Sequence, residues 1–573
     1  MATPLMAQME SAGGECVRVG NVDELQRALE SVGTRLRGVI RISAMESSDG
    51  HDATAEAMEI VRTARAVARA AGAPRLWLVT TGVWHLASDN SEGHAAQSPA
   101  WGLGRVIECE LPELRPVNAD LSASPDDNEI ELLSRLICGN GPEEQIAVRG
   151  EKYFAARYER MLPETGGTVT FRSDACYLIT GGLGGIGLHV AEWLAKNGAK
   201  HIALVGRRGP DEAARARIAA LESSGASVRV FSADISEHGQ VRSMLDTIHA
   251  ELPPLKGVFH LAAVTSAILL NDLDDESLDR VMRSKAVSAW VIDRCLDGLE
   301  LDFFVLFSSI TVVISQPGLA SYVAANAYSE GLARHRRARG LKAQSIGWAV
   351  WQSTGLCEDP QVQKGAQEYQ QMGIQPFQVE HALRVLGRIM AAGKTDVLAM
   401  PVVWDQFARS FGNAAPPRAF LDLLPKADIA SAPEASEAIG EKLRALEPAR
   451  RRAALETHLR ERLAAVLKTD STRIDPAKPF GAMGMDSLMG LEFVRRLSAT
   501  TGLRLPVTAV FNYPTIQTFA REIARRMSIA LETAAPAEVR PNLTAMRAPG
   551  SSVAGITEDE AIEALMAGGP RTV

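Results

Sequence analysis

The chain reads Thr180-Gly181-Gly182-Leu183-Gly184-Gly185-Ile186-Gly187 directly after an apolar segment, 175–180, and directly before a segment of helical character. A strand, a glycine-rich turn and a helix in this order are typical of a dinucleotide-binding site. Glycines let the backbone approach a pyrophosphate, and the N-terminus of a helix favours negative charge. A glycine-rich turn alone is weak evidence, because many are only tight turns. Here the flanking strand and helix are both present, so the stretch predicts a dinucleotide site.

The end of the next expected strand, 201–205, indicates which nicotinamide cofactor the site would take. There the chain reads Val205-Gly206-Arg207-Arg208-Gly209. An NAD site usually has a carboxylate at this point for the ribose 2′-hydroxyl, whereas guanidinium groups suit bidentate contact with a 2′-phosphate. Exposed arginines after a strand are also common, but no Asp or Glu competes for the position. We therefore expect NADPH, with Asp234, at the end of the third strand, near the adenine.

Strand-like and helical segments alternate around this turn. The expected strands within residues 170–411 are 175–180, 201–205, 228–232, 257–261 and 303–308. Such alternation predicts a doubly wound parallel sheet. Residues 1–162 also have an α/β pattern, with strand-like segments 38–42 and 76–80, but no glycine-rich phosphate turn follows either of them.

The pattern changes after an Ala-, Pro- and Glu-rich linker, 412–440. Apolar residues at helical spacing predict a first helix, a second helix that begins near Ser487, and further apolar faces beyond it. These positions are Leu455, Leu459, Leu463 and Leu467, then Leu488, Leu491, Val494 and Leu497, then Val507, Val510, Phe511, Ile516 and Phe519. Residues 441–527 therefore predict a small all-α bundle. A flexible tail with a short terminal helix is expected over 528–573.

Ser487 stands at the head of the second helix of this bundle, in Gly484-Met485-Asp486-Ser487-Leu488. Backbone N–H groups at a helix start can hold a phosphate on such a hydroxyl. For an isolated Asp-Ser-Leu an ordinary helix cap would be the better interpretation. The surrounding bundle favours a modification site.

The bulk composition limits the classes of protein. The chain has 573 residues, 46% hydrophobic and 23% charged, which is typical of globular protein with three or four domains. No apolar run of about 18 residues occurs, so we expect no membrane span, and the N-terminus is not that of a secretory signal. The six cysteines form no CxxC pair, and the histidines have no metal-ligand spacing. We expect a reducing cytoplasm, no disulfide framework and no metal.

The charge is uneven along the chain. The net charge is −8, but residues 441–526 contain 16 Lys and Arg against 9 Asp and Glu. Nucleic acid is a poor partner for a chain that is acidic overall and whose bundle lacks interleaved aromatic residues. Two interpretations remain open: solvated helix faces, or electrostatic docking of the bundle on acidic neighbouring domains.

A second set of residues lies behind the dinucleotide turn, with Lys285 upstream of Ser309, Tyr322 and Asn326. Tyr322 and Asn326 are four apart on an expected helix and share a face. Ser309 directly follows the expected strand 303–308. Each residue is ordinary by itself, but chance is a poor explanation for all four in this register.

This set, together with the turn, resembles the short-chain dehydrogenase/reductase family, and specifically the ketoreductase domain of modular polyketide synthases. The matching stretches are Val258-Phe259-His260-Leu261-Ala262-Ala263, Ser284-Lys285-Ala286, Leu306-Phe307-Ser308-Ser309 and Tyr322-Val323-Ala324-Ala325-Asn326-Ala327-Tyr328. The resemblance implies that residues 1–162 form a degenerate, structural Rossmann-like unit and that 170–411 form the catalytic one. The expected cofactor-binding residues are Thr180, Gly181, Gly182, Leu183, Gly184, Gly185, Ile186, Gly187, Arg207, Arg208, Asp234, Ile235 and Ala262.

The resemblance also implies a role for each of the four residues. Tyr322 would protonate the alkoxide that develops during reduction. A free phenol has a pKa near 10, so a nearby cation, Lys285, would make the protonation state of Tyr322 tunable. Ser309 would donate a hydrogen bond to the substrate carbonyl. Asn326 would help to hold the lysine or a proton-relay water.

Residues 441–527 resemble an acyl carrier domain, in which a serine at the position of Ser487 carries 4′-phosphopantetheine. The flexible arm would keep a thioester from diffusing away. Together, the resemblances imply the ketoreductase and carrier portion of a type I polyketide synthase, which reduces a β-ketoacyl thioester with NADPH. Its expected partners are the acyl thioester, a phosphopantetheinyl transferase, the upstream and downstream modules, and a second copy in the full assembly. We expect the upstream part of a longer chain to be missing.

Two alternatives remain open: a non-catalytic scaffold that acts as a carrier and docking module, and the equivalent part of a fatty acid synthase.

The resemblance to ketoreductases also predicts the configuration of the alcohol. Where related ketoreductases with one hydroxyl outcome have Leu-Asp-Asp, this chain has Thr265, Ser266 and Ala267, and the tryptophan that marks the other outcome is replaced by Ile314. The missing Leu-Asp-Asp implies the L-configured alcohol.

Overall fold

The computed structural model describes residues 1–531 except 45, 71, 73, 87–88, 90, 140, 142, 162–168, 353–359, 412–415, 425–438, 486, 504, 506–508 and 528. Several expectations therefore lie outside the described residues. These are most of the linker 412–440, Asp486, and nearly all of the tail 528–573 with its terminal helix.

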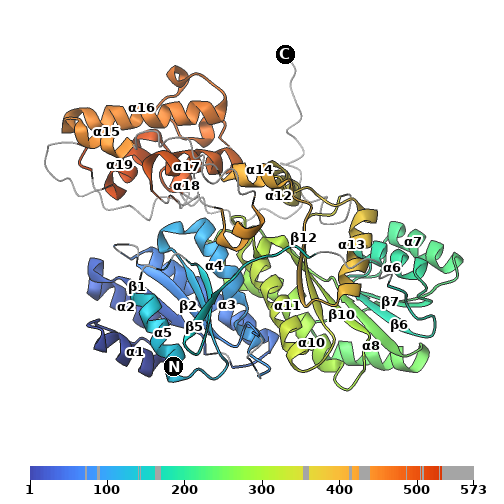
Figure 1. Cartoon of the computed structure of the whole chain (residues 1–573). Helices are drawn as coiled ribbons and strands as arrows, with labels where there is room; N and C mark the ends of the chain where they lie inside the picture. Colours follow the sequence, from blue (N-terminus) through green and yellow to red (C-terminus); the bar gives the residue numbers. More distant parts are fainter. Residues whose placement is uncertain are drawn as a thin grey trace, which may run out of the picture.

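The first unit is a five-stranded sheet with helices on both faces (Figure 1). Its strands are β1 (Gly38–Ile42), β2 (Arg75–Thr81), β3 (Val117–Leu121), β4 (Gln145–Arg149) and β5 (Lys152–Ala155). Its helices are α1 (Ala2–Ser11), α2 (Val22–Val32), α3 (Gly50–Ala68), α4 (Pro99–Glu110) and α5 (Asp127–Cys138). The strands lie in chain order, parallel except for β4 with β5. Because the strand order never reverses, this sheet lacks the crevice at which dinucleotides bind.

The second unit is a parallel sheet of order β12-β11-β10-β9-β6-β7-β8. Its strands are β6 (Cys176–Thr180), β7 (His201–Gly206), β8 (Ser227–Ser232), β9 (Leu255–His260), β10 (Phe303–Ser309), β11 (Gln344–Trp348) and β12 (Asp396–Ala399). The five strands expected from the sequence are confirmed to within two residues, whereas β11 and β12 are additional. The chain order reverses between β6 and β9, which creates a crevice at the carboxyl ends of the strands.

Helices cover both faces of this second sheet, as the doubly wound pattern predicts (Figure 1). The helices of this unit are α6 (Gly185–Lys196), α7 (Glu212–Ser223), α8 (His238–Glu251), α9 (Asp275–Met282), α10 (Ser288–Cys295), α11 (Ala320–Ala338), α12 (Pro360–Gln371), α13 (Val379–Ala392) and α14 (Trp404–Ser410). A π-helical turn, Arg283–Val287, joins α9 to α10.

The two α/β units share one apolar core. Helix α4 of the first unit packs against α11 of the second. A Cβ at Gly102 would lie 2.7 Å from Val323 Cγ1, and one at Gly331 would lie 1.9 Å from Ser98 Oγ. Only glycine allows these helices to approach so closely, so residues of both units together determine the interface.

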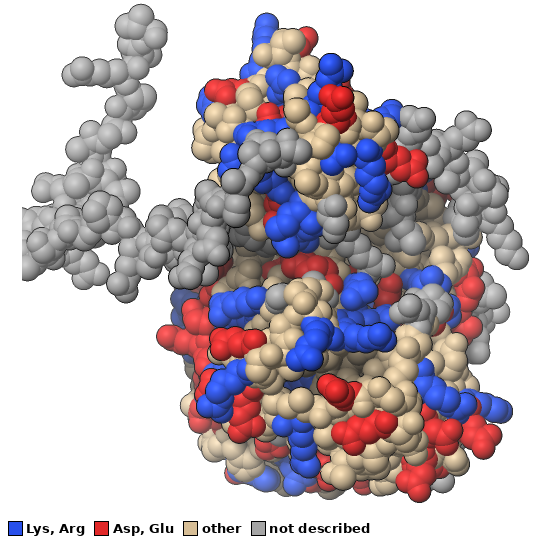
Figure 2. Space-filling model, turned by 90° about the vertical axis from the view of Figure 1, so that its left-hand side faces the viewer, with Lys and Arg blue, Asp and Glu red and all other residues tan. Residues whose placement is uncertain are grey.

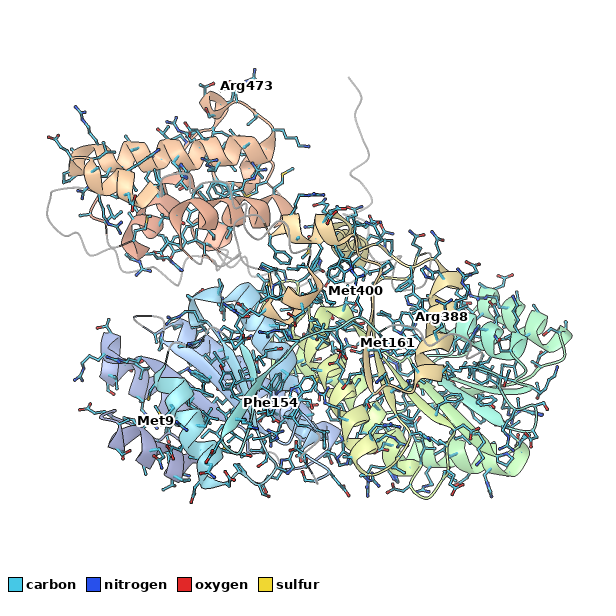
Figure 3. All side chains as sticks on the ribbon, in the orientation of Figure 1. Met9, Phe154, Met161, Arg388, Met400 and Arg473 are labelled. Carbon is cyan, nitrogen blue, oxygen red and sulfur yellow. The ribbon has the colours of Figure 1, made fainter. Side chains whose placement is uncertain are left out.

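The C-terminal region is a helical bundle beside the α/β units (Figure 1). Its helices are α15 (Ile439–Ala445), α16 (Pro448–Leu467), α17 (Ser487–Thr501), α18 (Ala509–Asn512) and α19 (Ile516–Arg526). Leu455, Leu459 and Leu463 pack against Leu497 and Phe519 in its core, which confirms the expected apolar faces at these positions. Figure 3 shows Arg473 on the side of the bundle that faces away from the two sheets.

Two further findings concern the described residues as a whole. None of their helices combines the length and apolar character that a membrane span needs, and no three of their His, Cys, Asp or Glu residues are grouped so that they could hold a metal ion. On the face drawn in Figure 2, Lys and Arg gather on the bundle and also on the α/β units directly beneath it, with Asp and Glu between them.

Candidate functional site

A cavity of about 1190 Å³ lies at the carboxyl ends of the second sheet. Most residues expected from the sequence line it. These are Gly181, Leu183, Gly184, Gly185, Ile186, Gly187, Arg207, Arg208, Asp234, Ile235 and Ala262, together with Lys285, Ser309 and Tyr322. Thr180, Gly182 and Asn326 do not line the cavity but lie directly behind residues that do.

The glycine-rich turn is shaped so that side chains are excluded from it. A Cβ at Gly182 would lie 2.7 Å from Ile179 O, and one at Gly187 would lie 2.4 Å from Gly181 O. Gly181 has a φ of +65°, which favours glycine. Helix α6 begins at Gly185, so its free N–H groups meet the cavity. A narrow backbone turn with a helix N-terminus fits a dinucleotide pyrophosphate.

Thr180 and His260 hold the loop that follows β9. Thr180 Oγ1 accepts hydrogen bonds from the N–H groups of Leu261, at 3.2 Å, and Ala262, at 3.3 Å. It lies 2.9 Å from His260 Nδ1, and His260 Nε2 lies 3.1 Å from the carbonyl oxygen of Lys285. Burial and the nearby Lys285 lower the pKa of His260 to about 3, so the ring is neutral. Its Nε2–H therefore donates to Lys285 O, and its Nδ1 accepts from Thr180.

The arginines expected at the 2′-phosphate, Arg207 and Arg208, are exposed in the loop that follows β7. Asp234 lies nearby, where its Oδ1 accepts from Ser236 N at 2.9 Å and from Ser236 Oγ at 2.7 Å. Partial burial opposes ionisation of Asp234, but these hydrogen bonds, with Arg207 and Arg283, hold its pKa below the ordinary value. The rim of the cavity thus contains two exposed guanidinium groups, Arg207 and Arg208, near the ionised carboxylate of Asp234.

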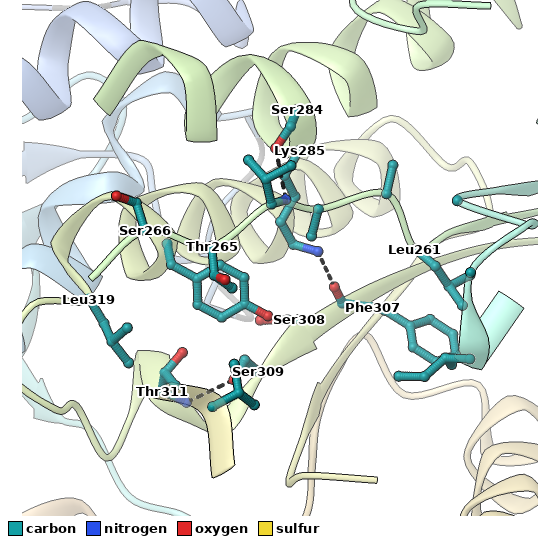
Figure 4. Close-up of a pocket in the computed structure, with 18 of the residues that line it drawn as sticks. Leu261, Thr265, Ser266, Ser284, Lys285, Phe307, Ser308, Ser309, Thr311 and Leu319 are labelled. Atoms are coloured by element: carbon teal, nitrogen blue, oxygen red, sulfur yellow. Dashed lines mark hydrogen bonds between the residues drawn. The ribbon is translucent and has the colours of Figure 1, made fainter. Parts of the chain in front are cut away.

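Lys285 lies on the π-helical turn and is buried. Its Nζ donates to the carbonyl oxygen of Phe307 at 2.6 Å (Figure 4). Burial lowers its pKa to about 7. The charge of this side chain is therefore responsive to what occupies the cavity, because any added negative charge would favour the protonated form.

Tyr322 lies in the first turns of α11 and lines the cavity together with Ser309. Burial raises the pKa of Tyr322, and hydrogen bonding by Asn326 and Ser309 partly offsets that effect. Ser309 Oγ accepts from Thr311 N at 3.2 Å (Figure 4), so its own O–H remains available as a donor.

Asn326, which is expected to help hold Lys285 or a proton-relay water, uses its amide nitrogen within α11. Its Nδ2 donates to the carbonyl oxygen of Tyr322 at 2.8 Å, one helical turn earlier. Its Oδ1 is buried and has no hydrogen-bond partner among the described residues. An unpaired buried acceptor is costly, so this oxygen is suited to a water or an ammonium group that enters the site.

Glu330 is a neighbour of the site that the sequence interpretation missed. Its Oε1 accepts from Ser308 Oγ at 2.9 Å, and Ser308 precedes Ser309 on β10. Burial raises the pKa of Glu330 to about 7. The available signal was weak: a carboxylate two helical turns after Tyr322 on a helix that is otherwise largely buried.

The raised pKa of Glu330 predicts a pH effect on stability. The folded protein holds this proton more tightly than the unfolded chain, so the contribution of Glu330 to wild-type stability is lost as the pH rises from about 4.5 to about 7. Glu330→Gln has no such proton, so its stability relative to the wild type should rise over that interval and level off above it. Urea unfolding at pH 5, 6, 7 and 8 measures this difference. Parallel curves for the two proteins would contradict the assignment.

Ser487 is the first residue of α17. The turn before it, Gly481–Met483, ends at Gly484 with a φ of +87°. The helix is anchored in the bundle by Phe493, Val494 and Leu497, whereas the side chains of Leu488 and Leu491 lie outside the described ones. The expected position of Ser487 at a helix start is confirmed.

Family models match three regions of the chain. A model of the KR domain matches residues 175–353, and a model of the phosphopantetheine attachment site matches 457–523. A model of the Rossmann fold domain of the polyketide synthase extender module SpnB matches residues 3–158. Each matched region falls in a different one of the three structural units, and the KR and carrier matches cover only part of theirs.

Whole-chain relatives are polyketide synthases. Polyketide synthase GfsA of Streptomyces halstedii is 33% identical over 94% of this chain and 7% of its own length. The pikromycin polyketide synthase component PikAIII of Streptomyces venezuelae is 32% identical over 89% of this chain and 33% of its own length. This chain thus spans a third or less of these curated relatives.

Solved structures agree with these matches. A structure of an A1-type ketoreductase is 30% identical, with a TM-score of 0.64 over 73% of this chain and 89% of that one. A second, of A-type ketoreductases from a modular polyketide synthase, is 30% identical with a TM-score of 0.65, over 73% of this chain and 90% of that one. On these sequence and structural matches, the chain belongs to the ketoreductase and carrier portion of the type I modular polyketide synthases.

Proposed function

We propose that this chain reduces a β-ketoacyl thioester, held on the phosphopantetheine arm of its carrier bundle, to the β-hydroxyacyl thioester with NADPH. One observation carries the proposal: Lys285, Ser309 and Tyr322 line the same cavity as the glycine-rich turn. The relatives named above are polyketide synthases, which favours that class over the fatty acid synthase alternative.

Lys285, Ser309 and Tyr322 have different roles at the carbonyl oxygen of the substrate. NADPH, when bound, would supply the hydride that reduces the β-carbon. Ser309, which lines the cavity beside Tyr322, donates a hydrogen bond to the carbonyl oxygen and orients it. Tyr322 gives its proton to that oxygen as negative charge develops there. Protonated Lys285 favours the resulting phenolate, and its field acts strongly because Lys285 itself is buried.

The cofactor would be held by the groups on the opposite side of the cavity. The turn and the N-terminus of α6 suit the pyrophosphate, and Arg207 with Arg208 suits a 2′-phosphate. Asp234 and Ile235 would meet the adenine end, and Ala262 lies on the loop fixed by Thr180. No carboxylate follows β7 directly, which supports NADPH rather than NADH.

The choice of cofactor has a direct test. The double variant Arg207→Ala and Arg208→Ala should raise KM for NADPH about tenfold or more, since two charge-assisted contacts are lost. KM for NADH should hardly change, because NADH has no 2′-phosphate. Initial rates with each cofactor provide the comparison. An equal loss with both would show that the arginines support the fold of the loop instead.

The activity itself is tested with a short β-ketoacyl thioester and with the same acyl group loaded on the carrier. NADPH oxidation is expected with both, and the alcohol formed is expected to be the L-configured one. No oxidation with either substrate would favour the alternative of a non-catalytic scaffold.

Ser487 would be loaded by a phosphopantetheinyl transferase, and neighbouring modules, in a dimeric assembly, would supply and accept the acyl chain. The cysteines found free in the structure support a reducing, cytoplasmic location.

A further inference from the structure

Two loops of the second unit form one end of the cavity. The loop between β9 and α9 lines it with residues 261–267 and Leu269, and the loop before α11 lines it with residues 316–319. The two loops are joined where Ile268 N donates to Gly318 O at 2.9 Å. Figure 4 shows Thr265, Ser266 and Leu319 around the end of the cavity where Ser309 lies.

A single side chain from the first unit also ties these loops together. Glu110, the last residue of α4, is 1% exposed. Its Oε2 accepts from Leu270 N at 2.7 Å, and its Oε1 accepts from Gly318 N at 2.9 Å. Each oxygen of one carboxylate thus holds the backbone of one loop. Burial raises the pKa of Glu110 to about 7, although the hydrogen bonds from the two N–H groups favour its ionised form.

Helix α3 of the first unit holds the same loop from its other side. Arg65 donates from Nε to the carbonyl oxygen of Leu270 and from Nη2 to that of Leu273. Both the N–H and the C=O of Leu270 are therefore bound by side chains of the first unit. Leu270 itself is fully buried in the core that the two units share.

We propose that Glu110 is a positioning residue for the substrate: by holding residues 270 and 318 it fixes the gap between the two loops, and so the face of the carbonyl that is reduced. The inference rests on the proposed function and assigns to the first unit a part in substrate selectivity. Glu110 does not line the cavity, so its effect passes through the loops that do.

The variant Glu110→Gln tests the proposal with almost no change in size. An amide has one oxygen acceptor, and its NH₂ group would face an N–H donor, so one loop is released. KM for the β-ketoacyl thioester should rise about tenfold, as expected when one buried hydrogen bond is lost. The share of the minor alcohol should rise at least severalfold, while the Kd for NADPH stays within about twofold, because the glycine turn and arginines are untouched.

Glu129→Gln is the matched control. Glu129 lies in the same unit and is 4% exposed. Its carboxylate also joins two loops, since it accepts from Ser122 N at 3.0 Å and from Gly150 N at 3.2 Å. Neither loop lines the cavity. This control loses the same kind of bond, and its KM and product ratio should equal those of the wild type.

Each outcome supports or opposes the proposal. A wild-type product ratio and KM in Glu110→Gln, or an equal change in Glu129→Gln, would overturn it. If Glu110→Gln does not fold, Glu110→Asp, which keeps the charge on a shorter side chain, is measured instead with the same expectation. If neither variant folds, Glu110 serves the fold and not the substrate, and the proposal is wrong. A wild-type chain that oxidises no NADPH would contradict the proposed function itself, which is a distinguishable result.

Discussion

Ser487→Ala is expected to abolish attachment of the phosphopantetheine arm. The transfer joins the phosphate to a side-chain hydroxyl, and alanine has none. The helix should be unaffected, because α17 is anchored by Phe493, Val494 and Leu497 further along it, and alanine is the best helix former. Intact-protein mass spectrometry after incubation with coenzyme A and a phosphopantetheinyl transferase should show one arm on the wild type and none on the variant.

A matched control lies on the same helix. Ser498 is only partly exposed, and its Oγ accepts from Leu505 N at 3.4 Å, within the bundle. Ser498→Ala should therefore still gain one arm. Addition to Ser487→Ala would mean that another hydroxyl is the attachment point. Ser487→Ala should lose reduction of carrier-bound substrate but keep reduction of a free thioester. This difference separates loading of the carrier from catalysis by the reductase.

Tyr322→Phe is expected to lower kcat by about 10²-fold or more, the usual range for loss of a general acid. The ring remains, so the packing of α11 and the Kd for NADPH should change little. Single-turnover oxidation of NADPH with a short β-ketoacyl thioester measures the effect on the chemical step without the influence of product release.

Two other tyrosines make this result specific. Tyr328, on the same helix, donates its hydroxyl to Ser48 O at 2.6 Å, away from the cavity, so Tyr328→Phe should keep kcat near the wild-type value. Tyr369 does line the cavity, but its hydroxyl donates to Ile314 O at 2.7 Å. If Tyr322→Phe kept normal turnover, Tyr369 would be the next candidate for the proton donor.

The sequence could predict those parts of the fold whose signals are local. Strands β6 to β10 have strand-like sequences with clear turns after them. The glycine-rich turn after β6 is a short motif that by itself predicts a dinucleotide site. Strand β11 was missed because Gln344, Ser345 and Gly347 do not have the pattern of a buried strand. Gln344 can be buried in this strand because its amide group is hydrogen-bonded: Nε2 donates to Ile389 O at 2.9 Å and to Lys394 O at 3.0 Å. Strand β12 has only four residues.

The site was predictable only as far as its residues share an element or a motif. Tyr322 and Asn326 share a helix face, and Ser309 ends a strand, so their proximity follows from spacing. The position of the Asn326 amide on the Tyr322 carbonyl depends on rotamers that spacing does not specify. Glu110 meets Gly318 across 208 positions of chain. A contact of that range depends on how two sheets are packed, which no short pattern in a single sequence encodes.

The close fit of α4 against α11 also has a consequence for exchanging parts between synthases. At Gly102 beside Val323, and at Gly331 beside Ser98, the two helices are so close that a Cβ atom would clash. A graft that carried only the second unit would set α11 against a foreign α4, which fits only if it also has glycine at the position of Gly102. We therefore expect the smallest transplantable piece to be the pair of units, although each has a sheet of its own.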